Sequence, residues 1–356
     1  DFRTYPAPRF FEPLLAHHDR AAVEVFCYSD VPPGKADAVT DRCRAYGHAW
    51  RDVAGLPDAA VAARVAADRV DVLVDLAGHM ANPRLTLFAR RAAPVQVTYL
   101  GYPGTTGLAT VDYRLTDSLQ DPPGAADRWH AERLWRLDPC CWCYRPDDDA
   151  PPVGPPPALA GRGPVTFAAL NRLAKASPRA LRLWARVLDA VPGSRLMALV
   201  PPGAERDPAA TGLFAAHGVG GERLVLVGGR PPREYLRLWA DADVALDAYP
   251  YHGMTTTCDA LWMGVPTVTL VGGRHASRVG LSLLSAVGLG GLAAGDEDAY
   301  VAAAAGLAAH LPGLAALRQG LRDRVRRSPL GDGPGLARRV EAAFLAMYEA
   351  RASGVR

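Results

Sequence analysis

Apolar and polar positions follow two alternating patterns along the first part of the chain. Short, nearly continuous apolar runs are typical of strands buried on both faces of a parallel sheet. Between them lie stretches in which apolar residues recur every three to four positions, as in amphipathic helices. The pattern therefore predicts a parallel sheet covered by helices. The predicted strands are 22–28, 70–76, 94–100, 111–115 and 133–137, and the predicted helices are 10–15, 36–44, 59–67 and 83–91.

The same alternation resumes after a segment rich in Asp, Pro and Gly at 147–164, which we interpret as a linker. Ser177 followed by Pro178 predicts the cap and the first turn of a helix that runs to about Ala190. Strand–helix alternation of this kind predicts a doubly wound sheet. The predicted strands are 165–170, 195–200, 223–227, 244–247 and 267–271, and the further helices are 208–217, 232–240, 256–263 and 276–287.

The two sets predict an α/β protein with two Rossmann-like domains, for which 356 residues are an ordinary length. We expect the first domain at 1–150, with its first strand truncated, a linker at 151–164 and the second domain at 165–330. The segment 331–356 carries an amphipathic helix with no strand after it, and is a candidate to pack back on the first domain. Two such sheets that face one another leave a cleft at the carboxyl ends of their strands, where ligands bind. Four loops that follow strands are expected to line it, at His79, Gly101, Lys175 and Thr255.

The stretch 247–264 reads as a strand end, a loop and the start of a helix with three threonines. The first turn of a helix leaves backbone N–H groups without intrahelical partners and carries partial positive charge, so it can bind a phosphate together with the Thr255 and Thr256 hydroxyls. Asp259, one turn later, is repelled by a phosphate but suits the hydroxyls of a ribose. The alternative is an ordinary helix with Thr at its cap and an acidic first turn.

Lys175 follows the strand at 165–170 and lies on the same side of the predicted sheet as the Thr255 loop. Alone, it would be read as a surface lysine, but the lysine, the threonine-rich helix start and Asp259 together suggest a site for a nucleotide diphosphate. Asp241 and Asp243 match a D-x-D metal motif, yet they lie at a helix-to-strand junction on the opposite edge, so we expect a structural cap there. We expect no metal in the site.

Composition excludes several classes. The hydrophobic share of 49% and the charged share of 22% are those of a globular protein, and no apolar run is long enough to span a membrane. The net charge of +3 comes from scattered basic residues, so nucleic acid is not an expected partner. The six cysteines lack metal-ligand spacing and are expected to be buried thiols of a cytoplasmic protein. Because the chain begins at Asp1 without Met, we expect it to be a fragment of a longer protein.

Several motifs in order resemble the catalytic region of the protein O-GlcNAc transferases, in the SPINDLY-like bacterial and plant branch. They are D-L-A-G-H at 75–79, R-x-A-P-V-Q-V-x-x-L-G-Y-P-G-T at 91–105, N-R-L-A-K at 171–175, Y-H-G-M-T-T-T-C-D-A-L-W-M-G at 251–264 and A-S-R-V at 276–279. The resemblance covers nearly the whole chain. It implies a GT-B fold, an inverting and metal-independent glycosyltransferase without a cofactor, a sugar-nucleotide donor, a protein acceptor and, often, tetratricopeptide repeats upstream.

Carried over by matching positions, the resemblance implies roles for single residues. Lys175 would contact the diphosphate, with Arg172 where relatives often have Gln or Asn. Thr255 and Thr256 would bind phosphate and Asp259 the ribose. The 230–235 loop, from Arg230 to Tyr235, would meet the base, with Tyr235 where relatives commonly have a stacking His. Two positions depart from the family pattern: Met254 stands directly before the threonines in place of a Gly or His, and Tyr5 stands where relatives carry a His.

We therefore expect transfer of a sugar, GlcNAc from UDP-GlcNAc, to Ser or Thr hydroxyls of a protein. Two alternatives remain: another donor such as GDP-fucose or a UDP-hexose, or a nucleotide-sugar-binding module with weak catalysis. The hydroxyl must lose its proton, and Tyr5 cannot simply replace His, because tyrosine, with an ordinary pKa near 10, is a poor base at neutral pH. Three explanations stay open: His79 takes the proton, the donor phosphate takes it while Tyr5 only orients groups, or transfer is slow.

Overall fold

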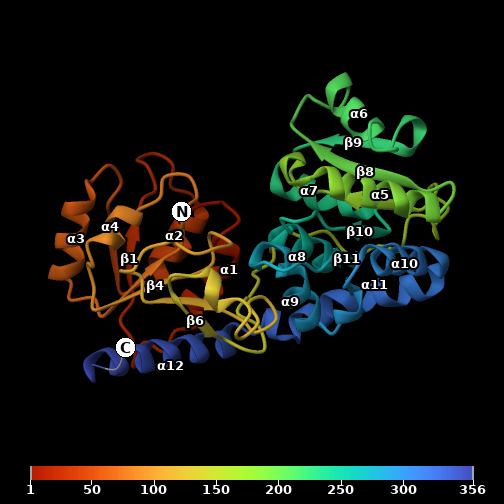
Figure 1. The fold of residues 1–356 in the computed structure, drawn as a ribbon. Coiled ribbons are helices and arrows are strands. Elements are labelled where there is room, and N and C mark those ends of the chain that lie inside the picture. Colours follow the sequence, from red (N-terminus) through yellow and green to blue (C-terminus); the bar gives the residue numbers. More distant parts are fainter. Residues whose placement is uncertain (1, 355–356) are drawn as a thin grey trace. The chain divides into compact units, whose positions relative to one another are not determined.

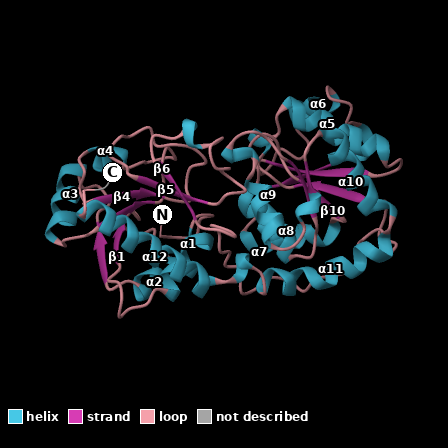
Figure 2. Ribbon diagram, turned by 60° about the horizontal axis from the view of Figure 1, so that its bottom comes forward, coloured by secondary structure: helices cyan, strands magenta, loops and turns pink. Residues whose placement is uncertain are grey.

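The computed structural model describes residues 2–354, which form parts of two compact units. The first unit combines residues 1–145 with the C-terminal segment 329–356, and the second unit is 146–328. In each unit, parallel strands form a sheet and helices pack against it (Figures 1 and 2). The α/β class and the parallel sheets expected from the sequence are confirmed.

The sheet of the first unit has the strand order β3-β4-β5-β6, and β1 and β2 form a separate parallel pair. All pairings in the four-stranded sheet are parallel, with Val72 opposite Val95 and Tyr113 opposite Arg133. Consequently, the loops after β3 and β4 leave from the same edge of the sheet. The elements are α1 (Pro8–His17), β1 (Phe26–Ser29), α2 (Ala38–Tyr46), β2 (Ala49–Asp52), α3 (Asp58–Ala67), β3 (Val72–Asp75), α4 (Leu85–Ala89), β4 (Val95–Thr98), β5 (Tyr113–Thr116), β6 (Arg133–Arg136) and α12 (Gly333–Ala352).

Helix α12 packs on α1 and on β4, so the C-terminal segment completes the core of the first unit. Its face buries Leu336, Val340 and Met347, each 0% exposed. His18, just after α1, meets Glu341 of α12 at 2.8 Å. Burial of three large apolar side chains stabilises this packing by several kcal/mol, about 1.5–3 for each.

The second unit has a six-stranded parallel sheet in the order β12-β11-β10-β7-β8-β9. The chain runs outward from β7 through β8 to β9, then crosses to β10 on the other side of β7. The strand order therefore reverses between β7 and β10. The elements are β7 (Thr166–Ala169), α5 (Pro178–Ala190), β8 (Arg195–Val200), α6 (Pro208–Ala215), β9 (Leu224–Gly228), α7 (Pro232–Leu238), β10 (Val244–Leu246), α8 (Met254–Trp262), β11 (Thr267–Leu270), α9 (Val279–Ala286), β12 (Ala293–Ala294), α10 (Glu297–Ala309) and α11 (Leu311–Arg326).

Helix α5 shows how the sequence specifies its own boundaries. The Ser177 hydroxyl accepts the Ala180 N–H at 3.2 Å, and Pro178 occupies the first helical position, as predicted. The apolar face of the helix buries Leu181, Trp184 and other side chains against the sheet and α10. Its predicted bounds, 178–190, are confirmed.

Four elements were not predicted, and several others, α8 among them, begin two to four residues away from their predicted starts. Strand β2 is short and half-exposed, β12 has two residues, and the alanine-rich α10 and the arginine-rich α11 were not predicted. Helix α8 begins at Met254, two residues before the predicted start, and its cap position is Gly253. The threonines therefore lie inside the first turn, and the alternative that places a threonine at the cap is wrong.

Within residues 2–354, no single helix is long and apolar enough to cross a membrane. By length and composition alone, α10 and α11 pass such a test only as a pair, bent by 97°.

Candidate functional site

The candidate site lies where the strand order of the second unit reverses. Ligands of doubly wound sheets bind at such a switch point, beyond the carboxyl ends of the strands. The loop after β7 carries Lys175, and the loop after the neighbouring β10 leads into α8. The two loops are tied together by a parallel bridge between Ala176 and Tyr249, and by the Ser177 hydroxyl, which donates to the Tyr249 carbonyl at 2.5 Å.

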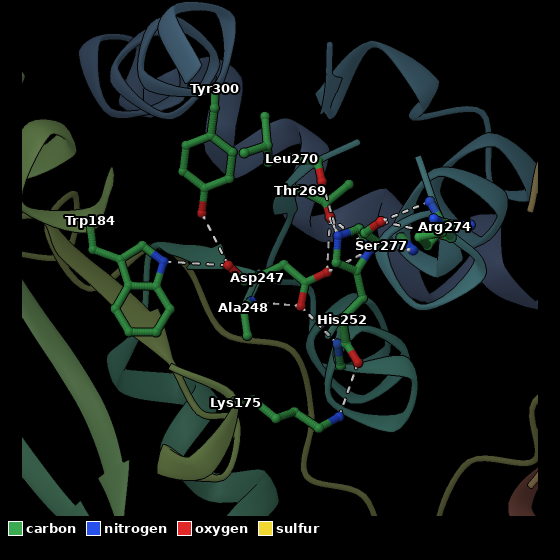
Figure 3. Close-up of polar contacts among 12 residues, drawn as sticks. Lys175, Trp184, Asp247, Ala248, His252, Thr269, Leu270, Arg274, Ser277 and Tyr300 are labelled. Carbon is green, nitrogen blue, oxygen red and sulfur yellow. Dashed lines mark hydrogen bonds and ion pairs between the residues drawn. The ribbon is translucent and has the colours of Figure 1, made fainter. Parts of the chain in front are cut away.

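The Lys175 ammonium points at the second of these loops. Its Nζ donates to the His252 carbonyl at 3.0 Å, two residues before α8 begins (Figure 3). The pKa of this ammonium is lowered to about 8, mainly by burial; Asp247 opposes the shift, and Arg172 adds a smaller contribution to it. Lys175 is therefore charged at neutral pH and loses its charge just above that range.

His252 and Asp247 hold the loop before α8 in place (Figure 3). One Asp247 oxygen accepts the Ala248 and Gly253 N–H groups, each at 2.9 Å. His252 is fully buried: its Nε2–H donates to the Leu270 carbonyl at 3.0 Å, and its Nδ1 accepts the Gly280 N–H at 3.0 Å. Because burial holds the pKa of His252 below its ordinary value, the ring is neutral, and its two hydrogen bonds hold the loop in one position.

The first turn of α8 presents backbone N–H groups with no side-chain cap. Thr255 and Thr256 are half-buried within this turn. Asn171 lies beside it, because a Cβ added to Gly253 would overlap the Asn171 amide oxygen. That oxygen is buried and has no hydrogen-bond partner within residues 2–354. A helix start of this kind, next to a lysine, can hold an anion such as a phosphate.

The structure brings only some of the predicted binding residues to this point. Lys175, Thr255 and Thr256 lie at the start of α8, and the exposed Arg172 is close enough to Lys175 to lower its pKa. Asp259 follows on the same helix and is buried, with only 3% of its surface exposed. Its role stays a prediction.

The predicted base loop follows β9, which is the edge strand, two strands from β7. Arg230 is exposed and lies 3.9 Å from Glu234. The Tyr235 hydroxyl, at the start of α7, donates to the Leu170 carbonyl at 3.3 Å, just before the Lys175 loop. Tyr235 therefore reaches the same loop as Lys175.

His79 belongs to the first unit, in the loop after β3. Its Nε2 lies 3.1 Å from the Thr106 carbonyl, and its ring meets the Tyr102 ring edge-on at 5.0 Å between centroids. Because a carbonyl can only accept, Nε2 carries the proton. In the neutral ring, Nδ1 then holds the lone pair, and the exposed side chain can accept a proton there.

A buried carboxylate fixes the loop that holds His79. Glu132 accepts hydrogen bonds from the Thr105 hydroxyl at 2.7 Å, from the Thr106 N–H at 2.6 Å and from the Thr106 hydroxyl. Burial alone would raise the pKa of Glu132, but these hydrogen bonds outweigh it and hold that pKa below its ordinary value. Sequence reasoning missed Glu132, Asp247 and His252, because a buried polar residue leaves no spacing signal in one sequence.

The loops after β3 and β4 leave no room for a side chain at Gly78 or Gly101. A Cβ on Gly78 would lie 2.5 Å from the Tyr102 Cβ, and one on Gly101 would overlap the Leu76 carbonyl. The glycines of D-L-A-G-H and G-Y-P-G-T therefore let the two loops approach closely. Tyr5, the other predicted catalytic position, is half-buried and lies just before α1 in the same unit.

The remaining motifs have structural roles. Asp243 accepts the Thr166 and Ala158 N–H groups, and Asp241 lies 3.5 Å from Arg162, so the D-x-D pair has a structural role, in which it ties the linker to the sheet. Within residues 2–354, no group of three or more His, Cys, Asp or Glu side chains could hold a metal ion. All six cysteines are buried thiols outside any disulfide, as we expected of them.

Comparison with known sequences agrees with these motifs. The family model described as glycosyl transferase family 41 matches residues 1–138 and 161–336. Two relatives described as probable UDP-N-acetylglucosamine–peptide N-acetylglucosaminyltransferase SPINDLY, from Arabidopsis thaliana and Solanum lycopersicum, are 43% and 42% identical over 99% of this chain. The similarly described SEC of Arabidopsis thaliana is 31% identical. The chain spans only 39% and 38% of the length of the two SPINDLY proteins.

Two solved structures are similar to this one. A mutant O-GlcNAc transferase of Thermobaculum terrenum has a TM-score of 0.92 at 39% identity, covering 100% of this chain and 67% of that chain. A structure described as trehalose-6-phosphate from E. coli bound with UDP-2-fluoro glucose has a TM-score of 0.50 at 14% identity, covering 82% of this chain and 76% of that chain, and bears on the fold alone. The fold is of the GT-B class, as predicted.

Proposed function

Because this chain belongs to glycosyl transferase family 41, we propose that it transfers GlcNAc from UDP-GlcNAc to Ser or Thr hydroxyls of a protein acceptor. One observation carries the proposal: the Lys175 ammonium lies 3.0 Å from the carbonyl of His252, beside the uncapped start of α8. A cation and free backbone N–H groups at one point match the two phosphates of a nucleotide donor.

In the proposed reaction, the acceptor hydroxyl attacks the anomeric carbon of the sugar from the face opposite the diphosphate. The bond from that carbon to the phosphate oxygen breaks, and negative charge builds up on the leaving UDP. Lys175, the first turn of α8 with Thr255 and Thr256, and Arg172 stabilise this charge, so no metal or cofactor is required. Asp259 serves the ribose, and Arg230 and Tyr235 meet the base.

The acceptor proton goes to Nδ1 of His79 in this proposal. The hydrogen bond from Nε2 to the Thr106 carbonyl supports it, because it leaves Nδ1 as the basic nitrogen. Tyr5 orients neighbouring groups without taking the proton. The first unit accordingly serves the acceptor and the second unit the nucleotide sugar. The six buried thiols, none of which forms a disulfide, support a reducing, cytoplasmic location.

Calorimetric titration with UDP, GDP, UDP-GlcNAc and GDP-fucose tests the donor. Binding of UDP and UDP-GlcNAc, with no heat from the guanine nucleotides, is expected. Because Asp259 is proposed to contact only the ribose, Asp259→Ala should lower the affinity for UDP and leave the affinity for pyrophosphate unchanged. Preference for GDP-fucose would replace the proposed donor, and failure to bind any of the four would refute the proposal.

A further inference from the structure

An exposed aromatic side chain borders the candidate site. Tyr251 lies in the loop between β10 and α8, immediately before His252, and 41% of its surface is exposed. Exposed tyrosines are ordinary by themselves, and most need no explanation. This one differs because of what its ring faces.

The ring of Tyr251 covers one side of the Lys175 ammonium. The Lys175 Nζ lies 4.0 Å from the ring centroid, while the same nitrogen donates to the His252 carbonyl at 3.0 Å. Two consecutive residues thus bracket the cation, one with the face of its ring and the other with its carbonyl. An ammonium within about 6 Å of an aromatic face is attracted by the negative charge density of that face.

His252, whose carbonyl accepts the Lys175 hydrogen bond, is itself held by several hydrogen bonds. The His252 backbone N–H donates to the Ala276 carbonyl at 3.0 Å, and its buried ring is bonded to Leu270 and Gly280, as Figure 3 shows for Leu270. The carbonyl that receives Lys175 therefore cannot drift. A lysine side chain, by contrast, has four rotatable bonds, so a second contact is needed to keep the ammonium at one place.

We propose that Tyr251 is a positioning residue for Lys175: its ring holds the ammonium beside the first turn of α8, where the diphosphate of a nucleotide donor binds. The inference deepens the proposed function and rests on it, because it requires Lys175 to meet the diphosphate. The ring does not itself touch the reacting atoms.

The role of Tyr251 can be tested through pH, because the charges around Lys175 set the pKa of its ammonium. Asp247 at the end of β10 favours the charged ammonium, Arg172 on the Lys175 loop disfavours it, and His252 is neutral. Burial brings the pKa of Lys175 to about 8. An aromatic face favours the cation, so removal of the ring lowers this pKa further, and the charge is lost at a lower pH.

The test compares Tyr251→Phe, which keeps the ring, with Tyr251→Leu, which removes it. Affinity for UDP is measured by calorimetry from pH 6.5 to 9.5. We expect Tyr251→Phe to match the wild type. We expect Tyr251→Leu to bind UDP about two- to tenfold more weakly near pH 8, with its alkaline loss of affinity starting at a lower pH. Tyr348→Leu, the same change at an exposed tyrosine of α12, is the control and should change nothing.

Two results would overturn the role of Tyr251 alone. One is a Tyr251→Leu curve of UDP affinity against pH that superimposes on the wild-type curve. The other is a Tyr251→Phe protein that binds UDP as weakly as Tyr251→Leu, which would assign the effect to the hydroxyl. In both cases the wild type still binds UDP, so the proposed function stands. A wild-type protein that bound neither UDP nor GDP would overturn the proposed function and this inference with it.

Discussion

At the scale of single residues, Lys175 makes the sharpest prediction. Lys175→Ala should weaken UDP binding by about tenfold to a hundredfold at pH 7, because a hydrogen bond to a charged group contributes roughly 1.5–3 kcal/mol. Wild-type affinity should also fall as the pH rises through about 8, where the ammonium becomes neutral. The variant, which lacks that group, should bind with little dependence on pH in the same range. Equal pH profiles for the two proteins, measured by calorimetry, would remove Lys175 from the site.

His79 carries the second prediction at this scale. His79→Ala should lower kcat by about a hundredfold or more, because a positioned general base contributes roughly 10²–10⁴ in rate. Its affinity for UDP should stay at the wild-type value, since His79 does not meet the donor phosphates in the proposed reaction. His310→Ala, at an exposed histidine of the second unit, serves as the control. If His79→Ala turned over peptides at the wild-type rate, a base other than this imidazole would be required.

Much of the residue-level site could be predicted from the sequence, for a physical reason. Lys175 and the threonines follow strand ends, and strand ends of a parallel sheet meet at one edge, so their proximity follows from the pattern. The supporting residues could not be predicted. Glu132 reaches Thr106 over 26 positions, and His252 meets Gly280 over 28, so only the folded chain brings each pair together.

At the scale of elements, the start of α8 depends on a glycine. A Cβ at Gly253 would overlap the Asn171 amide oxygen and lie 2.9 Å from the Thr256 Cβ, so Gly253→Ala must shift the first turn of the helix. Because the phosphate is proposed to bind that turn, UDP affinity should fall by about tenfold or more. Gly273→Ala, where an added Cβ meets nothing within 4 Å, should leave the affinity unchanged. A Gly253→Ala protein that binds UDP as tightly as the wild type would show that the anion does not need this turn.

Element boundaries also show where sequence patterns stop being informative. The cap and proline at Ser177 and Pro178 set the start of α5 correctly, because the capping hydrogen bond is local. The start of α8 was placed two residues late, because Gly253 makes no side-chain cap and the helix is held by Asp247 through the Gly253 N–H. Helix α10 is so rich in alanine that its buried face, which carries Tyr300, hardly differs from its exposed face in sequence.

At the scale of the whole molecule, our proposal assigns the acceptor to the first unit and the nucleotide sugar to the second unit. In the proposal, Lys175, the first turn of α8 and Arg172 together meet the charge of the diphosphate, without a metal ion. Turnover should therefore be the same after treatment with EDTA as before. Strict dependence on added Mg²⁺ or Mn²⁺ would contradict this and would make Asp241 and Asp243, which here contact Arg162 and Ala158 of the linker, candidate metal ligands.

Transfer of GlcNAc from UDP-GlcNAc to a peptide can be measured directly. The protein is incubated with UDP-GlcNAc and a library of peptides that contain Ser and Thr, and peptide masses and released UDP are measured together. We expect peptides that each gain one GlcNAc, UDP released in equal amount, and loss of both products in Lys175→Ala. Unmodified peptides and no released UDP, from a protein that binds UDP-GlcNAc, would contradict it.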